Sequence, residues 1–306
     1  MSRADSVSQA VDRFLSVVGL EVRLATVSYY AQCLRPLRDL EKPISEVDVD
    51  DLRALYADLL KRRTRYAGHP SRPELAGGLS VYTLHKYVRA WKRFFRWMVE
   101  ESMIARDPSI KLKRPRLPDE PPKDVTPDDL RRMLEAARDN PRDYAIVCFL
   151  ADTACRVGGV VSLRRRDIDL DEGFALVREK GDQARLVYFT ARTAQAVAAY
   201  LDADCSDEAD MDSEFVFRGL RGPLTTAGVY QALRRLARRA GVKGRWNPHA
   251  FRHAWARQAL KRSANLQEVS EILGHRSIVV TAKFYARYLD RELQVRHGEV
   301  SWMAGR

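Results

Sequence analysis

The chain is poor in cysteine, and the placement of its cysteines excludes two classes of protein. Only four of the 306 residues are cysteine. They are widely scattered, no two form a Cys-x-x-Cys pair, and none lies beside a histidine at the spacing of zinc ligands. A disulfide-rich secreted scaffold and a zinc-ribbon protein are therefore excluded. We expect the four thiols to be reduced and structural; they are Cys33, Cys148, Cys155 and Cys205.

Long apolar runs are also missing. No stretch approaches the ~18 consecutive apolar residues that a membrane helix needs. The first residues, 1–5, include an acid and lead into an amphipathic segment, so neither a secretory signal nor a transit peptide is visible. We therefore expect no membrane association and a cytoplasmic location.

Negative charge is in short supply. The chain has 53 Lys and Arg against 41 Asp and Glu, which gives a formal net charge of +12. The excess is shared, with 22 basic and 16 acidic residues up to residue 120 and the remaining 31 and 25 after it. This balance indicates a polyanionic partner for both halves of the chain.

Apolar periodicity and capping residues predict a mainly α protein with two domains. The segment 111–123, KLKRPRLPDEPPK, holds four prolines and is typical of an extended linker. We expect a helical domain over 1–112, a linker over 113–124 and a second, mostly helical domain over 125–306. A small antiparallel sheet is expected where Phe174–Val177 and Arg185–Phe189 flank a Gly181-Asp182 turn. Helices are expected near 7–20, 25–40, 50–63, 80–98, 126–138, 141–154, 191–202, 224–240, 248–262, 266–273 and 277–290, with a loop over 66–78.

The fourth predicted helix carries a basic face. Its cations recur at helical spacing, whereas Tyr87, Trp91, Phe94 and Phe95 occupy mostly the other side. No acid lies between the first and the last of these cations, so a solvated surface helix is the weaker interpretation. Such a face can contact phosphates in a DNA groove. The predicted DNA-binding residues are Lys86, Arg89, Lys92, Arg93 and Arg96.

Four short motifs in the second half supply the groups needed to attack a phosphodiester. They are Thr153–Val157, Lys180–Asp182, His249–His253 and Leu273–His275, the last followed by Tyr285. Two guanidiniums can hold the negative charge that gathers on phosphorus oxygens as a tyrosine oxygen attacks. The phenol must lose a proton and the departing sugar oxygen must gain one, which are tasks for positioned acids and bases. The predicted catalytic residues are Arg156, Arg252, Lys180, His249, His275 and Tyr285.

These motifs, in this order, resemble the tyrosine recombinase (phage integrase) family, and the likeness to its Xer/Cre-like two-domain members covers nearly the whole chain. The usual TGLRxSEL motif is matched by Thr153–Val160, HxLRH by His249–His253, LGH by Leu273–His275, and the hairpin KGxxxRxVP pattern begins at Lys180. The resemblance implies a helical, SAM-like core-binding domain and a catalytic domain that together form a C-shaped clamp on DNA.

The activity implied by the resemblance is site-specific recombination of double-stranded DNA through a covalent 3'-phosphotyrosyl intermediate. Four protomers would act on two paired sites, with no metal and no other cofactor. Integration, excision and resolution are all compatible with this activity. Two alternatives stay open: a catalytically silent DNA-binding protein on the same fold, and a type IB topoisomerase.

The chain departs from the family pattern at two places. Family members commonly carry Glu three residues after the first arginine, where this chain has Gly159. Most also place the nucleophile nine residues after the LGH histidine, which here is Phe284. Tyr285, at ten residues, is the predicted nucleophile, with Tyr288 as the alternative. His253 is ranked below His275 as a functional residue, and a zinc site at His249 and His253 is not expected because no third ligand accompanies them.

Overall fold

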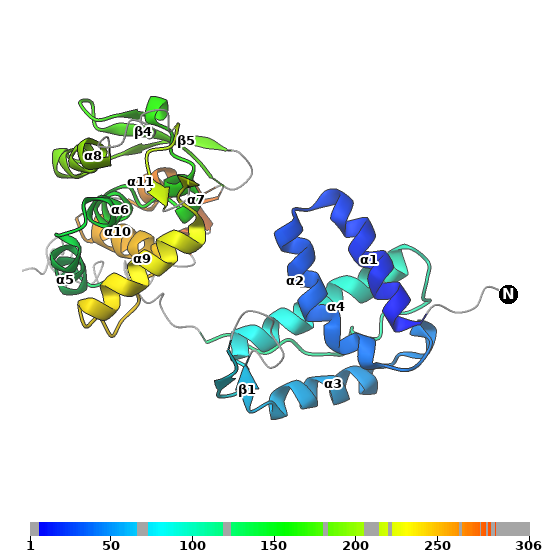
Figure 1. Cartoon of the computed structure of the whole chain (residues 1–306). Helices are drawn as coiled ribbons and strands as arrows, with labels where there is room; N and C mark the ends of the chain where they lie inside the picture. The colour runs from blue at the N-terminus through cyan, green and yellow to red at the C-terminus, as the bar shows by residue number, and fades with distance from the viewer. Residues whose placement is uncertain are drawn as a thin grey trace, which may run out of the picture. The chain divides into compact units, whose positions relative to one another are not determined.

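The computed structural model divides into two compact units, residues 1–119 and 120–306 (Figure 1). The division falls inside the segment predicted as a linker, while the exact domain limits stay a prediction. The structure describes residues 6–65, 73–118, 124–179, 183–204, 214–219, 222–262, 265–275, 277–279, 281–282 and 285.

The first unit is built from helices that bury an aromatic core. Phe14 of α1 meets Tyr30 of α2 and Phe94 and Trp97 of α4 edge-on, with ring centroids 5.3–5.5 Å apart. Aromatic pairs in this geometry stabilise a core beyond the area they bury. The elements are α1 (Val7–Glu21), α2 (Leu24–Leu34), the 3-10 helices Arg35–Asp39 and Ile44–Glu46, α3 (Val49–Lys61), and α4 (Val81–Glu100), with the short antiparallel pair β1 (Thr64–Arg65) and β2 (Leu75–Ala76).

Local sequence explains where these helices begin and end. Asp48 caps α3 by accepting hydrogen bonds from two backbone N–H groups, and Ser80 caps α4 by accepting one from Thr83. The predicted helix over 25–40 is α-helical only to Leu34 and continues as a 3-10 turn at Pro36, because proline lacks an N–H and crowds the preceding turn. The predicted loop over 66–78 holds a strand at its end, β2, whose two residues are too few to show an alternating pattern.

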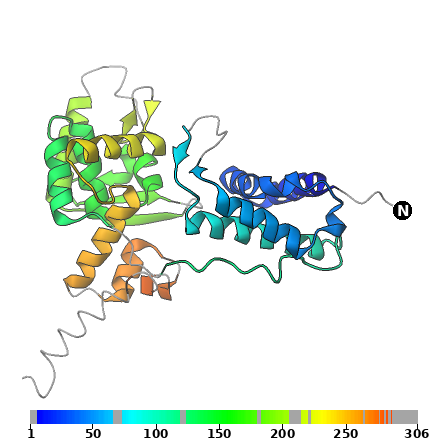
Figure 2. The same ribbon diagram turned by 90° about the horizontal axis from the view of Figure 1, so that it is seen from below.

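The second unit packs helices around a three-stranded antiparallel sheet. Strand β4 pairs with β5 in a register that sets Phe174 opposite Tyr188, and the short strand β3 adds to the other edge of β4. Figure 1 shows the sheet at the end of this unit away from α5, and Figure 2 shows the same chain from below. The elements are α5 (Pro127–Ala137), α6 (Pro141–Thr153), α7 (Val157–Val161), a 3-10 turn (Arg165–Asp167), β3 (Ile168–Asp169), β4 (Phe174–Arg178), β5 (Ala184–Tyr188), α8 (Ala191–Asp204), the pair β6 (Arg218–Gly219) and β7 (Gly222–Pro223), α9 (Thr226–Arg239), α10 (Pro248–Lys261) and α11 (Leu266–Leu273).

The prediction of a mainly α fold with small antiparallel sheets is confirmed. Strand β3 and the β6–β7 pair were not predicted, since two-residue strands carry no periodicity. The helix predicted over 277–290 lies mostly outside the described residues. No helix in the described parts of the chain is both long enough and apolar enough to cross a membrane.

Candidate active site

Arg156 lies at the turn between α6 and α7. Helix α6 ends at Thr153, and Ala154 follows with φ 51° and ψ 21°. A left-handed conformation costs an alanine on the order of 1–2 kcal/mol, and the Ala154 carbonyl is held there by a hydrogen bond of 2.9 Å from Arg252 Nη1. Arg156 occupies the residue before α7 without capping it through its side chain, which keeps one third of its surface exposed. The guanidinium is thus placed where it can contact both protein and an external phosphate.

Arg252 makes hydrogen bonds that connect its own motif with two of the other three motifs. It lies one turn into α10, whose start is fixed by Asn247 accepting a hydrogen bond from the Ala250 N–H and by Pro248 in the first turn. One guanidinium nitrogen donates to the Ala154 carbonyl and the other to the Leu273 carbonyl. Burial, and then the nearby charge of Arg156, lower its pKa to about 10. At neutral pH the buried guanidinium is therefore still protonated.

The two histidines of α10 differ in their surroundings. His249 keeps much of its surface exposed. Partial desolvation of its ring, and then the charges of Arg252 and Arg156, lower its pKa. His253 is half-buried, and desolvation followed by the charges of His249 and Arg252 lowers its pKa to about 4. Its Nδ1 lies 2.5 Å from the Tyr285 Oη. A neutral imidazole accepts a hydrogen bond at its unprotonated nitrogen, so His253 can accept a hydrogen bond from the Tyr285 hydroxyl.

This pKa predicts a pH-dependent stability. A histidine whose folded pKa is depressed leaves the protein less stable as pH falls from about 6.5 towards 4, because only the unfolded chain takes up the proton. Between pH 7 and pH 5 we expect wild type to lose about 2 kcal/mol more unfolding free energy than His253→Asn. Denaturant titrations at the two pH values measure this difference. Equal losses in both proteins would show that His253 is protonated as readily in the folded state.

His275 follows the end of α11. Gly274 takes the left-handed conformation that ends the helix, with φ 62°. A Cβ at this position would lie 2.7 Å from Arg185 Cδ, so both space and backbone require glycine. The His275 Nδ1 lies 2.7 Å from the Thr281 Oγ1. Burial, with the charges of Arg252 and Arg156, lowers the pKa of His275 to about 4.

Tyr285 is buried, with 1% of its surface exposed. It packs in a small apolar cluster with Ala154, Leu260 and Leu273. The predicted nucleophile is therefore brought next to the first arginine motif, α10 and the LGH turn. Phe284 and Tyr288 lie outside the described residues, as does Lys180.

Two functional candidates were missed by the sequence analysis. Glu179, the residue directly after β4, is buried, and one of its oxygens accepts the Arg156 backbone N–H at 2.8 Å. Its carboxylate also pairs with the guanidiniums of Arg156 and of Arg185, the latter at 3.1 Å. Arg185 in turn donates to the Ile272 carbonyl at 2.7 Å. The motif pattern contained Arg185 but gave no sign that a carboxylate joins it to Arg156.

The predicted basic face of α4, in the first unit, is partly engaged within that unit. Lys92 Nζ binds the carbonyls of Ser109 and Ile110, and burial lowers its pKa. Arg93 pairs with Glu100 at 3.2 Å. Arg89 lies over the ring of Tyr29, 5.5 Å from its centroid. Lys86 and Arg96 are exposed, so they are the residues of the face best able to reach phosphate.

DNA binding should weaken steeply with salt, and these two residues should contribute to the slope. Each phosphate contact contributes roughly 0.9 to the slope of log affinity against log salt. We expect Lys86→Gln and Arg96→Gln each to reduce the slope by about 1, as measured by fluorescence anisotropy on duplex DNA. Arg53→Gln, which changes an exposed arginine of α3 paired with Asp50, serves as control. A slope unchanged in all three variants would contradict the assignment of the α4 face to DNA.

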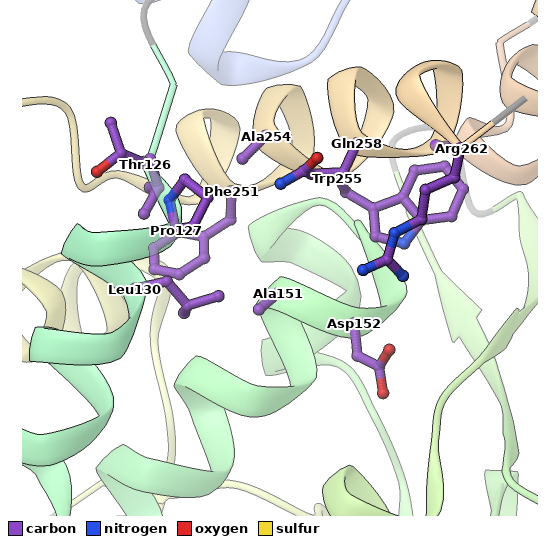
Figure 3. A pocket seen from close by; sticks show the side chains of 12 residues that line it. Thr126, Pro127, Leu130, Ala151, Asp152, Phe251, Ala254, Trp255, Gln258 and Arg262 are labelled. Carbon is purple, nitrogen blue, oxygen red and sulfur yellow. The ribbon is translucent and has the colours of Figure 1, made fainter.

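A pocket of about 390 Å³ lies between α10, α6 and the start of α5, and none of the predicted catalytic residues lines it. Figure 3 shows Phe251, Trp255 and Leu130 around it, with Asp152 and Arg262 at one end. The Asp152 carboxylate already accepts hydrogen bonds from Thr190 and Thr193. Among the described residues, no three His, Cys, Asp or Glu side chains are grouped so that they could hold a metal ion.

The structure thus gathers two arginines, three histidines and a tyrosine in one helical unit. Arg252 contacts the backbone beside Arg156 and His275, and Tyr285 contacts His253. A mostly helical fold with this set of side chains around a tyrosine is that of a tyrosine recombinase.

Comparison with known proteins assigns the family. Residues 123–292, more than half of the chain, match the Phage integrase family. The tyrosine recombinase XerC of Xanthomonas campestris pv. campestris (strain B100) is 29% identical over 284 residues, which cover 91% of this chain and 84% of that protein. The chain therefore belongs to the phage integrase family.

Two solved structures resemble it in fold. One is the XerH site-specific recombinase bound to a palindromic difH substrate in a post-cleavage complex, with 18% identity and a TM-score of 0.72 over 95% of this chain and 84% of that one. The other is a lambda integrase tetramer bound to a Holliday junction, with 14% identity and a TM-score of 0.70 over 92% and 78%.

Proposed function

We propose that this tyrosine recombinase cleaves and rejoins double-stranded DNA at specific sites, with Tyr285 as the nucleophile. The observation that carries the assignment of the site is the clustering of Tyr285, His253 and Arg252 beside the Arg156 turn. Tyr285 Oη forms a bond to phosphorus, the bond from phosphorus to the 5' oxygen breaks, and the DNA is held as a 3'-phosphotyrosine. Rejoining uses the same chemistry in reverse: a 5'-hydroxyl from the partner site attacks the phosphorus, the bond to Tyr285 Oη breaks, and the phenol regains its proton.

The proposed roles of the other residues follow from their charge. Arg156 and Arg252 bind the non-bridging oxygens and stabilise the charge that builds up in the transition state. His249 and Lys180 serve the two proton transfers, from the phenol and to the 5' oxygen, and His275 donates to the phosphate. Because the phosphodiester energy is kept in the protein–DNA bond, rejoining requires neither ATP nor a metal ion.

Tyr285 must move for attack. A phosphate has to reach the phenolic oxygen within about 3.5 Å, and a side chain that is 1% exposed does not allow this approach. The hydrogen bond to His253 and the packing against Leu260 and Leu273 therefore describe the state before attack. DNA binding is expected to shift the segment that carries Tyr285 towards the arginines.

The proposed assembly is a homotetramer on two paired DNA sites, supported by the lambda integrase tetramer that shares the fold. In this proposal residues 1–112 form the core-binding domain, residues 125–306 form the catalytic domain, and the two close on DNA as a clamp. The proposed place of action is the cytoplasm.

The test is a search for a covalent product. The full chain is incubated with fragmented DNA from its source, without metal or nucleotide, and protein attached to 3' ends is isolated under denaturing conditions. Sequencing of the attached DNA then gives the target site. If the chain binds DNA with steep salt dependence but forms no adduct on a DNA that contains its site, the catalytically silent DNA-binding protein is favoured instead. If single sites are cleaved and supercoils are relaxed without pairing of two sites, the topoisomerase is favoured.

A further inference from the structure

A buried carboxylate lies between two arginines beside the proposed phosphate site. Glu179 directly follows β4, and only 4% of its side chain is exposed. Its Oε1 accepts the Arg156 backbone N–H at 2.8 Å and the Arg185 Nη2 at 3.1 Å, while its Oε2 pairs with the Arg156 Nη1. Arg156 is thus held through both its backbone and its guanidinium by one side chain.

Helix α7 packs so closely on β4 that the carboxylate that contacts Arg156 comes from the strand side, from Glu179, and not from position 159 of the helix. Gly159 lies three residues after Arg156, and a Cβ at Gly159 would lie only 3.2 Å from the Val177 Cβ. Val177 and Glu179 are two residues apart, so they point to the same face of the extended chain. The helix therefore meets the strand in two successive contacts, Gly159 on Val177 and Arg156 on Glu179. A glutamate at position 159 has no room unless Val177 moves.

Three arginines, Arg156, Arg185 and Arg252, lie close enough around Glu179 to affect one another's charge. Besides burial, the positive charges of Arg156 and Arg185 lower the pKa of Arg252, whereas the negative charge of Glu179 raises it. Although burial alone would raise the pKa of Glu179, the Arg156 N–H and the charges of Arg185 and Arg156 outweigh it and lower this pKa. Glu179 is therefore ionised at neutral pH, within a cluster of three arginines.

We propose that Glu179 is a positioning residue for Arg156, and that it supplies from β4 the carboxylate that similar recombinases carry three residues after their first arginine. The inference rests on the proposed function, because Arg156 needs a fixed orientation only if it holds the scissile phosphate. A guanidinium is a planar fork whose value for a phosphate depends on its orientation. Glu179 fixes one edge of this fork while a third of the Arg156 side chain stays exposed.

The principal test is Glu179→Gln, which keeps the shape of the side chain and an acceptor for the Arg156 N–H but removes the charge. The rate of covalent adduct formation is measured at saturating protein on a nicked suicide duplex that carries the recovered target site. We expect this rate to fall on the order of 10²-fold, as for other small misplacements of catalytic groups, with DNA affinity nearly unchanged. Glu179→Asp, which keeps the charge, should recover part of the rate.

Asp143 provides a matched control. It is also buried and also pairs with two arginines, Arg142 at 2.9 Å and Arg235 at 2.7 Å. It lies at the other end of α6, ten residues or about 15 Å from Thr153. Asp143→Asn should lower thermal stability as Glu179→Gln does, but should leave the rate of adduct formation unchanged.

A second DNA separates positioning from general structural damage. When the scissile phosphate is replaced by a neutral methylphosphonate, less negative charge has to be stabilised, so a residue that acts through Arg156 should matter less. We expect the loss caused by Glu179→Gln to shrink to a few-fold on this DNA, as should the loss caused by Arg156→Ala. In the double variant on the same DNA, Glu179→Gln should add little to Arg156→Ala, because residues that act as a unit are not additive.

The outcomes distinguish the two proposals. If wild type forms no adduct, the proposed function fails. If wild type forms the adduct and Glu179→Gln forms it at the same rate, the role of Glu179 is overturned while the function stands. The same holds if Glu179→Gln lowers the rate of adduct formation by one constant factor on both DNAs and in the Arg156→Ala background.

Discussion

Tyr285→Phe is expected to bind DNA as wild type does and to form no covalent adduct. The substitution removes one oxygen from a buried side chain, so the apolar packing against Leu260 and Leu273 is kept. What is lost is the oxygen atom that bonds to phosphorus in the proposed reaction. The expected loss is complete within detection, at least about 10⁴-fold, comparable with removal of other covalent nucleophiles. Band-shift affinity and adduct yield on the same duplex measure the two properties separately.

Tyr288→Phe is the control for this prediction. Tyr288 is the other tyrosine close to the LGH motif that could serve as the nucleophile, and its substitution should leave adduct formation intact. An active Tyr285→Phe protein together with an inactive Tyr288→Phe protein would move the nucleophile to Tyr288.

Arg252→Lys is expected to reduce adduct formation by about 10²–10³-fold, the range found when a preorganised donor to a transition-state anion is removed. Arginine at this position donates to the Ala154 and Leu273 carbonyls through two different nitrogens. An ammonium is a single point charge on a flexible stem and cannot keep both contacts while also facing phosphate. Lysine retains the positive charge, so the loss measures geometry and not charge.

The matched control for Arg252→Lys is Arg235→Lys. Arg235 lies on α9 and pairs with Asp143 at 2.7 Å, without contacting any predicted catalytic residue in the described part of the chain. Its substitution should leave the rate of adduct formation within a factor of two. A comparable loss in both variants would mean that the effect of Arg252→Lys reflects the stability of the unit.

Much of the fold could be predicted because local sequence determines it. Helices α4, α5 and α10 begin at or next to the residues where they were predicted to begin. Each has a capping side chain at its start, from Ser80, Thr126 and Asn247 respectively, and α5 and α10 carry a proline in the first turn. These signals act over three or four residues and need no tertiary information. The strands of two residues could not be predicted, because their pairing is decided by the rest of the fold.

The candidate site was predicted through its motifs, and the limits of that approach are physical. Motifs named Arg156, Arg252, His249, His275 and Tyr285, but they do not report which side chains meet. The contact of His253 with Tyr285 joins residues 32 apart, and the pairing of Glu179 with Arg156 joins residues 23 apart. Such contacts depend on how α10 and β4 pack, which no local pattern encodes. Gly159 marked a departure from the family pattern close to Arg156, but it did not indicate that a carboxylate from another element contacts Arg156.

In the proposed reaction, Tyr285 carries the DNA during strand exchange. The most direct measurement isolates the covalent adduct of the wild-type chain, digests protein and DNA, and identifies by tandem mass spectrometry the residue that bears the nucleotide. We expect a 3'-nucleotide on Tyr285 and on no other residue. A nucleotide on Tyr288, on a serine or on a histidine, or attachment through a 5' phosphate, would rule out Tyr285 as the nucleophile.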